Sequence, residues 1–110
     1  MSPLITSTGI DPPNSSFEAA TAIIGDKWSL LIIASAFLGM SKFDDFHREL
    51  GIARNILAAR IKALIEHDLI ARSKYLDKPL RFEYILTPKG QNLNEVIGSI
   101  QSWGQMWYPN

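Results

Sequence analysis

The sequence predicts a mainly α-helical domain that contains one β-hairpin. Three observations lead to this fold class. Apolar residues recur at helical spacing through most of the chain, two short segments alternate with a period of two, and a turn-rich stretch separates those two segments. The 110 residues include 46% hydrophobic and 20% charged types, which is the composition of a soluble globular chain. We therefore expect one domain with a single core.

The N-terminal part is expected to consist of an arm and a first helix. Residues 1–14 include the turn-forming run DPPN and are expected to be a poorly ordered arm, so that the folded domain covers residues 15–110. Ser15 and Glu18 have the spacing of a capping box, in which Ser15 is the N-cap. This helix is predicted to end at Gly25.

Two further helices follow. Asp26 is suited to cap the second helix, which is expected to continue through an apolar stretch to Leu38 and to stop at the glycine after it. Ser41 and Asp44 form another capping signature. They open a short helix that is predicted to end at Leu50.

A helix-turn-helix is predicted around Gly51. After this glycine a new helical pattern begins, and its buried stripe consists of Leu57, Ile61, Leu64 and Ile65. Two helices joined by a short glycine-containing turn are typical of the helix-turn-helix motif. The face opposite the stripe carries Arg54, Asn55, Ala58 and Lys62.

A β-hairpin and a last helix complete the chain. Residues 69–75 and 81–86 alternate with a period near two, and the turn-rich residues 76–80 connect them. Thr87 is the expected N-cap of a single last helix that continues to Trp107, because Pro88 suits the first helical position. A helix-turn-helix followed directly by a two-stranded wing is a winged helix-turn-helix.

The net charge of zero conceals a regional difference. Eleven Lys and Arg balance eleven Asp and Glu, but nine of the basic and six of the acidic residues lie within residues 41–81. That segment therefore carries +3 and the remainder −3, while residues 53–81 alone carry +4. Such asymmetry is typical of a basic binding face on a neutral domain, and a solvated helix face with scattered charges is the alternative.

Duplex DNA is the partner that suits this arrangement. One helix end enters the major groove, where base edges display a readable pattern, while the basic hairpin lies against the neighbouring backbone. Since arginine pairs with guanine and asparagine with adenine, the predicted base-reading residues are Arg54, Asn55 and Ala58. The predicted phosphate-contacting residues, which set the register, are Ser41, Lys42, Ala53, Arg60, Lys62, Arg72, Lys74, Lys78 and Arg81.

Several spaced motifs together resemble one family. Residues 25–32 (GDKWSLLI) resemble the GGKWTLLI block of the HxlR-type winged helix-turn-helix transcriptional regulators, and residues 43–50 (FDDFHREL) resemble that family's RFNELRREL-type helix. Residues 51–64 are similar to its recognition helix, and residues 79–90 to its PPRVEYSLTPLG segment. Trp103 and Gly104 fit its C-terminal helix. The resemblance covers residues 15–104 and implies a bacterial-type regulator of transcription.

Two departures from the family pattern change what is expected. Ala53 stands where the family often has Ser at the start of the recognition helix, which removes a side-chain cap worth about 1 kcal/mol and weakens a phosphate contact. Ser15 stands where many members have Cys, and the chain contains no Cys, so sensing through a thiolate is excluded. Any signal is expected to arrive by another route, for which a small-molecule effector of unidentified chemistry is the candidate.

A homodimer is predicted because the first, second and last helices carry more apolar surface than a small domain covers. The last helix keeps its stripe for about four turns, and the resemblance also implies that it packs against its symmetry mate together with the first helix. The alternative is a stripe that is satisfied inside one subunit. The predicted interface residues are Phe17, Ala20, Ile24, Leu93, Val96, Ile97, Ile100, Trp103 and Trp107. A two-fold dimer predicts a pseudo-palindromic site with half-sites roughly 34–36 Å apart.

The sequence contains no pattern typical of an enzyme or a metal site. His47, expected on the exposed side of its helix, and His67, expected at a helix end, lack the spacing of a metal or catalytic motif. We therefore expect no enzymatic activity and no cofactor or metal. Residues 30–38 are too short an apolar run to cross a bilayer, and a signal peptide is not recognisable. A cytoplasmic location without a membrane partner is expected.

The predicted function is a sequence-specific, double-stranded DNA-binding regulator of transcription that acts as a homodimer. The alternative is a winged-helix protein–protein interaction module without DNA binding. Ala53 and the acidic residues Asp44, Asp45 and Asp77, which are expected near the binding face, keep this alternative open. A steep loss of binding with rising salt distinguishes DNA binding from protein binding.

Overall fold

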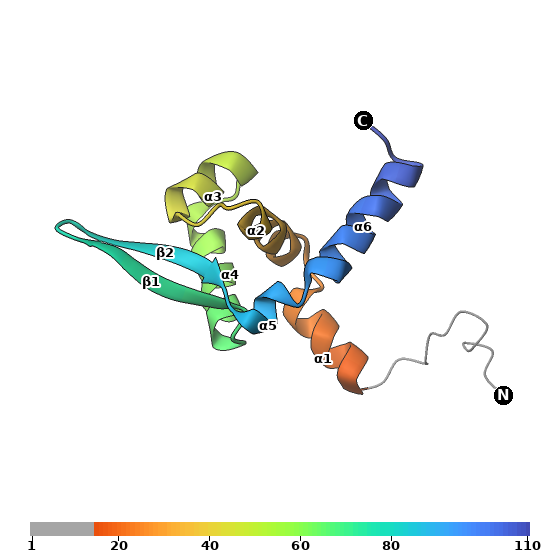
Figure 1. Ribbon diagram of the computed structural model, residues 1–110, viewed down its shortest axis with the longest axis horizontal. Helices are drawn as coiled ribbons and strands as arrows, with labels where there is room; N and C mark the ends of the chain where they lie inside the picture. Colours follow the sequence, from red (N-terminus) through yellow and green to blue (C-terminus); the bar gives the residue numbers. More distant parts are fainter. Residues whose placement is uncertain (1–14) are drawn as a thin grey trace.

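The predicted fold class is confirmed by the computed structural model, which describes residues 15–110. Its elements are α1 (Ser15–Ile24), α2 (Lys27–Phe37), α3 (Phe43–Leu50), α4 (Arg54–Glu66), β1 (Ile70–Asp77), β2 (Leu80–Leu86), α5 (Pro88–Gln91) and α6 (Asn94–Trp107). The β1–β2 hairpin extends from one end of the molecule, and α1 and α6 extend from the other (Figure 1). The arm expected at residues 1–14 lies outside the described residues.

The core lies where α2, α3 and α4 meet the base of the hairpin. The predicted stripe of α4 is buried at three positions, and its fourth, Ile65, is half-buried against the others. The buried apolar side chains of the core are Ile32, Ile33, Phe46, Ile52, Leu57, Ile61, Leu64, Leu69, Ile70 and Leu86. In α1 and α6 every residue is exposed or half-buried. Burial therefore stabilises the helix-turn-helix and leaves the two terminal helices at the surface.

The first two helices end and begin close to the predicted residues. Ser15 is the first residue of α1, one position later than an N-cap would stand, and the helix stops before Gly25 as expected. Asp26 is confirmed as the N-cap of α2, because its carboxylate accepts hydrogen bonds from the Ser29 amide at 2.9 Å and from the Ser29 hydroxyl at 2.7 Å.

No single helix within residues 15–110 is long and apolar enough to cross a membrane, although α1 and α2, bent by 75°, together have that length and composition.

The Asp26 cap predicts a pH dependence of stability. Partial burial raises the pKa of this carboxyl, but the two Ser29 hydrogen bonds and nearby Arg60 outweigh burial and hold the pKa below its ordinary value of 3.8. A carboxyl with a lower pKa in the folded state adds stability above the unfolded pKa, and this is lost as pH falls through the folded pKa. In urea unfolding, Asp26→Ala should cost about 1 kcal/mol at neutral pH and less below pH ~3. A cost that stays the same at both pH values would contradict this assignment.

The prediction that Ser41 caps the third helix is wrong. Lys42 occupies the N-cap position of α3. Ser41 instead belongs to an extended segment beside β2, where its hydroxyl donates to Oε2 of Glu83 at 2.9 Å and its carbonyl accepts from the Tyr84 amide at 2.7 Å. Ser41 thus stands one residue before the N-cap, and the pairing with β2 directs its hydroxyl toward Glu83 rather than toward the first amides of α3.

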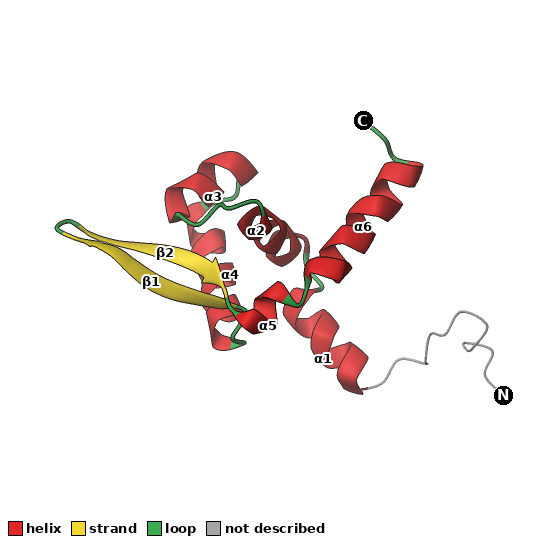
Figure 2. Cartoon of the chain, in the orientation of Figure 1, coloured by secondary structure: helices red, strands yellow, loops and turns green. Residues whose placement is uncertain are grey.

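The hairpin is longer than predicted. The strands pair antiparallel and reach Asp77 and Leu80, so the turn consists of Lys78 and Pro79 rather than residues 76–80. The register shifts between Lys74 and Leu76. Because of this irregularity, the end of the first strand does not follow the strict period of two by which the sequence predicted it. Figure 2 shows the resulting two-stranded wing beside the helices.

The single last helix that we predicted is in fact two helices. Thr87 caps α5 as expected, with Oγ1 accepting from the Gly90 amide at 3.0 Å. The helix then stops after one turn, and Leu93 leaves helical geometry before α6 begins. Leu93 packs against the core, and Gly90 lies so close to the Leu69 carbonyl that a Cβ would collide with it. These contacts with the core and the base of the hairpin thus interrupt the helix, although apolar residues continue at helical spacing beyond it.

Candidate nucleic-acid interface

The turn between α3 and α4 brings the start of α4 to the surface. Gly51 ends α3 in the left-handed region, with φ of 65°, and Ile52 is buried in the core. Ala53 is the N-cap of α4, and its methyl side chain accepts no hydrogen bond. The first amides of α4 therefore face outward without a side-chain cap, as the substitution of Ala for Ser predicted.

The three predicted base-reading residues occupy the exposed side of α4. Arg54 and Asn55 form its first two positions, and Ala58 follows one turn later. All three are exposed, whereas Leu57 and Ile61 turn into the core. The N-terminal part of a recognition helix is the part that approaches base edges in a helix-turn-helix, so their location is compatible with that role.

A hollow of about 360 Å³ lies between α4 and the wing. It brings together Ala58 and Lys62 of α4 and Arg72 of β1, with Phe43 and Tyr84 among its other walls. The Arg72 guanidinium lies over the Phe82 ring at 4.2 Å from the centroid, so an aromatic side chain supports this cation. Two predicted phosphate-contacting residues thus adjoin one base-reading residue.

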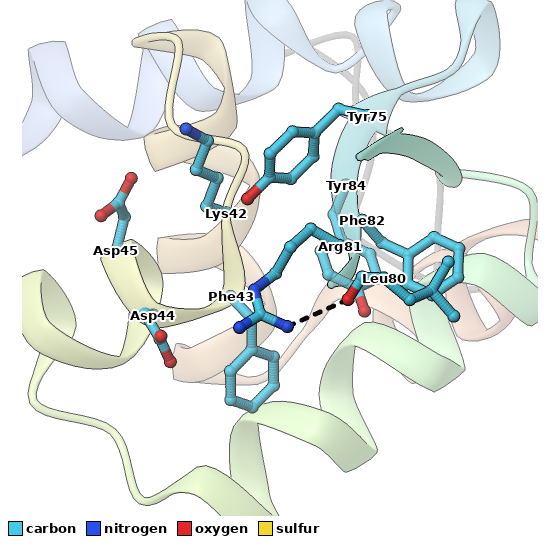
Figure 3. A pocket seen from close by; sticks show the side chains of 9 residues that line it. All are labelled: Lys42, Phe43, Asp44, Asp45, Tyr75, Leu80, Arg81, Phe82 and Tyr84. Carbon is cyan, nitrogen blue, oxygen red and sulfur yellow. Dashed lines mark hydrogen bonds between the residues drawn. The ribbon is translucent and has the colours of Figure 1, made fainter. Parts of the chain in front are cut away.

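A second hollow, of about 310 Å³, separates the start of α3 from the wing. Figure 3 shows Lys42, Arg81, Phe43 and Tyr75 around it. The Lys42 ammonium lies 4.9 Å from the centroid of the Tyr75 ring, and the Arg81 Nη1 donates to the Leu80 carbonyl at 3.0 Å. Cations of α3 and of the wing therefore border a common surface.

Arg60 is not brought to this surface. It lies two residues from both Ala58 and Lys62, and two residues correspond to about 200° around a helix. Its Nη1 instead lies 3.8 Å from Oδ2 of Asp26, at the start of α2.

In the wing, the Lys74 ammonium pairs with the Asp77 carboxylate at 2.7 Å. Together with Ser41, which bonds Glu83, these residues have partners within the chain.

Asp44 was expected near the binding face, but the sequence did not identify its partner, nor the aromatic side chains as parts of the surface. Asp44 accepts a hydrogen bond from Arg54 at 2.8 Å, and this bond lowers the pKa of the Asp44 carboxyl. Its neighbour Asp45 binds Arg48 at 2.8 Å and raises the pKa of that arginine. Two of these aromatics directly follow a cation in the sequence of the wing, as Lys74-Tyr75 and Arg81-Phe82. This sequence adjacency is the signal from which they could have been predicted.

His47 is not exposed, contrary to our expectation. It is half-buried, and its Nδ1 lies 2.8 Å from the Ile52 carbonyl, so it connects α3 to the turn. His67 lies at the C-terminal end of α4, as predicted. Across residues 15–110 no group of three or more His, Asp or Glu side chains is arranged to hold a metal ion.

The predicted dimer residues divide into two groups. Ile24, Leu93 and Ile97 are half-buried and pack against the core of their own chain. The remaining positions are exposed, with Trp103 at 60% and Trp107 at 64%, and the group is Phe17, Ala20, Val96, Ile100, Trp103 and Trp107. An apolar groove of about 320 Å³ between α2 and α6 adjoins them, lined chiefly by Leu and Ile side chains.

Known proteins with similar sequences are regulators by name. The HxlR-like helix-turn-helix family matches residues 23–110. An uncharacterized HTH-type transcriptional regulator of Mycobacterium bovis, Mb3122, is 38% identical over 90 residues, which are 82% of this chain and 57% of that protein. The chain thus spans little more than half the length of that relative. The uncharacterized HTH-type transcriptional regulator YvaP of Bacillus subtilis is 30% identical over 92 residues, covering 83% of this chain and 85% of YvaP.

A solved structure agrees with these sequence relationships. The redox regulator HypR in its reduced form superposes with a TM-score of 0.78 at 26% identity, over 84% of this chain and 92% of HypR. The similarity therefore extends over most of the chain. The chain belongs to the HxlR-like helix-turn-helix family.

Proposed function

We propose that this chain is a sequence-specific, double-stranded DNA-binding regulator of transcription that acts as a homodimer. One observation carries the proposal: the exposed face of α4 shares a hollow with the basic wing, through Ala58, Lys62 and Arg72. A recognition helix and an adjoining cationic hairpin match a major groove and the backbone next to it. The named relatives, which are regulators, support the same function.

Within this proposal, α4 reads bases and the wing contacts phosphates. Arg54 recognises guanine and Asn55 recognises adenine through paired hydrogen bonds, while the Ala58 methyl permits close approach. The phosphate contacts come from exposed residues that border the two hollows or lie in the turn of the wing, which are Lys42, Lys62, Arg72, Lys78 and Arg81. Arg60 is omitted because it faces α2, and Ser41 and Lys74 are secondary because they have partners in the chain.

The homodimer is proposed from the exposed apolar face of α6. A monomer would leave Ile100, Trp103 and Trp107, which share one side of α6 at steps of three and four residues, largely in water, and exposed apolar surface of this kind marks an interaction site. A two-fold pair would present two copies of α4 to half-sites roughly 34–36 Å apart. The expected DNA site is therefore pseudo-palindromic. The 110 residues contain no cysteine. We therefore propose that this regulator does not sense a signal through a thiol, and that any effector is of another kind.

The proposal is tested by selecting bound duplexes from a random pool at two salt concentrations. We expect an enriched motif with two-fold symmetry, and affinity that falls steeply with salt, with a slope near −0.9 per phosphate neutralised. A pool that shows no enrichment at either salt concentration would contradict DNA reading. It would favour the alternative, in which the wing and α4 bind a protein.

Single substitutions separate the two kinds of contact. Asn55→Ala should relax the preference at one base pair by a factor of about 5–150. Lys78→Ala should weaken binding to all duplexes alike and reduce the salt slope by about 1. Both are measured by fluorescence anisotropy on the selected site and on single-base variants of it. Lys27→Ala, which removes a cation next to Trp28 on α2, is the matched control and should bind as the parent does. Equal binding by all four proteins would refute the assigned face.

A further inference from the structure

One ion pair joins the two helices of the helix-turn-helix at the proposed reading face. Arg54, the first residue of α4, donates from Nη1 to Oδ1 of Asp44 in the first turn of α3, at 2.8 Å. The Phe43 ring lies near the same guanidinium, with 6.0 Å between Cζ and the ring centroid. A carboxylate and an aromatic ring therefore both restrict where this guanidinium lies.

Stability does not explain this contact. The Arg54 and Asp44 side chains are 60% and 73% exposed, and ion pairs in water add little to folding. The contact acts instead on conformation, because a long side chain that is already held loses less rotamer freedom when it binds. Among residues 15–110, Asp44 takes one of the five guanidinium N–H donors, so four are left, and two of these are enough for O6 and N7 of guanine.

We propose that Asp44 is a specificity-determining positioning residue that holds Arg54 in the orientation needed to read guanine. The proposal rests on the proposed function, since it concerns the same DNA-binding face. Asp44 has a second, opposite effect, because its negative charge faces the phosphates and weakens attraction to every sequence alike. Asp44 thus increases discrimination between sequences and lowers non-specific binding.

The charge state of the pair is suited to this role. The hydrogen bond from Arg54 and its positive charge hold the pKa of the Asp44 carboxyl below its ordinary value, and His47 and Arg81 act in the same direction. The carboxylate is therefore ionised at neutral pH. Arg81 lines the same hollow as Asp44, so the negative charge lies between a proposed reader of bases and a proposed phosphate contact.

The chain provides a closely matched control in the next residue. Asp45 has the same charge and also lies in the first turn of α3, so it makes a similar interaction with the helix dipole. Its partner is Arg48 at 2.8 Å, on the same helix, rather than a residue of α4. Replacing Asp45 therefore changes the charge and the interaction with the helix dipole as replacing Asp44 does, but leaves Arg54 held by Asp44.

The test compares Asp44→Ala, Asp45→Ala and Arg54→Ala with the parent chain. Each protein is titrated with the duplex selected from the random pool, with duplexes changed at one base pair at a time, and with an unrelated duplex. Arg54→Ala should lose about tenfold of its discrimination at one base pair. Asp44→Ala should lose about threefold to tenfold at that same base pair, while binding the unrelated duplex more tightly. Asp45→Ala should bind the unrelated duplex more tightly without any loss of discrimination.

The outcomes distinguish this inference from the proposed function. The inference is overturned if Asp44→Ala changes all affinities by one factor, as Asp45→Ala does, or if Arg54→Ala leaves the base preference intact. A parent chain that enriches no duplex overturns the proposed function, and the inference with it, before any variant is compared. If urea unfolding shows that Asp44→Ala is not folded, Asp44→Asn replaces it and is judged by the same criteria.

Discussion

Trp103→Glu should convert the proposed dimer into a monomer of 12.3 kDa and reduce affinity for the full DNA site by on the order of 10²–10⁴. Trp103 lies on the exposed apolar side of α6 with Ile100 and Trp107. A charge placed within a packed apolar interface loses its hydration without gaining a partner. The loss in DNA affinity follows because two linked recognition helices bind together, whereas a single one binds alone.

Sedimentation at micromolar concentration measures the first effect, and titration of the selected duplex measures the second. Gln105→Glu is the matched control, because it adds the same charge on the opposite side of α6, about 160° away from Trp103. It should sediment and bind as the parent does. A parent chain that is already a 12.3 kDa species under these conditions would refute the dimer. A Trp103→Glu variant that sediments at twice that mass would show instead that Trp103 does not lie in the dimer interface.

Phe46→Ala should remove about 3–5 kcal/mol from the free energy of unfolding. Phe46 comes from α3, is 0% exposed and lies in the core that α2, α3 and α4 share. Replacing the ring by a methyl group removes buried apolar surface and leaves a cavity where three helices meet. Because domains of this size are stable by only about 5–15 kcal/mol, we expect a partly unfolded population and weak DNA binding.

Urea unfolding at one fixed protein concentration measures this effect, since stability of a dimer depends on concentration. Leu38→Ala is the comparison, because Leu38 is also a large apolar residue but is 88% exposed at the end of α2. Its cost should stay within about 0.5 kcal/mol. A Phe46→Ala variant within 1 kcal/mol of the parent chain would show that the core does not depend on the packing of α3.

Local signals in the sequence were sufficient for most element boundaries. Asp26 and Thr87 cap their helices with the predicted hydrogen bonds. Such caps are predictable from the sequence because the side-chain oxygen binds an amide only three residues further along the chain. Gly51 ends α3 for a similarly local reason, since its positive φ suits a residue without a Cβ. The stripe of α4 was also predictable, because one face of that helix is buried along its length.

The errors occurred where partners distant in sequence decide the outcome. Ser41 bonds Glu83 across 42 residues instead of capping α3. Arg60 faces Asp26, and Arg54 faces Asp44 across ten residues, so neither ion pair follows from the spacing within one helix. The last helix breaks at Leu93 because that side chain packs on the core.

The sequence by itself determined that this chain is a winged helix-turn-helix, which face of α4 is buried, and that its positive charge lies on α4 and the wing. These features depend on periodicity, capping and turn residues, all of which act over a few positions. Only the tertiary structure decided which cations share a surface, and that Asp44 and Phe43 restrict Arg54. The physical reason is that the direction and partner of a long charged side chain depend on neighbouring helices and strands. The spacing of residues along the chain does not specify those neighbours.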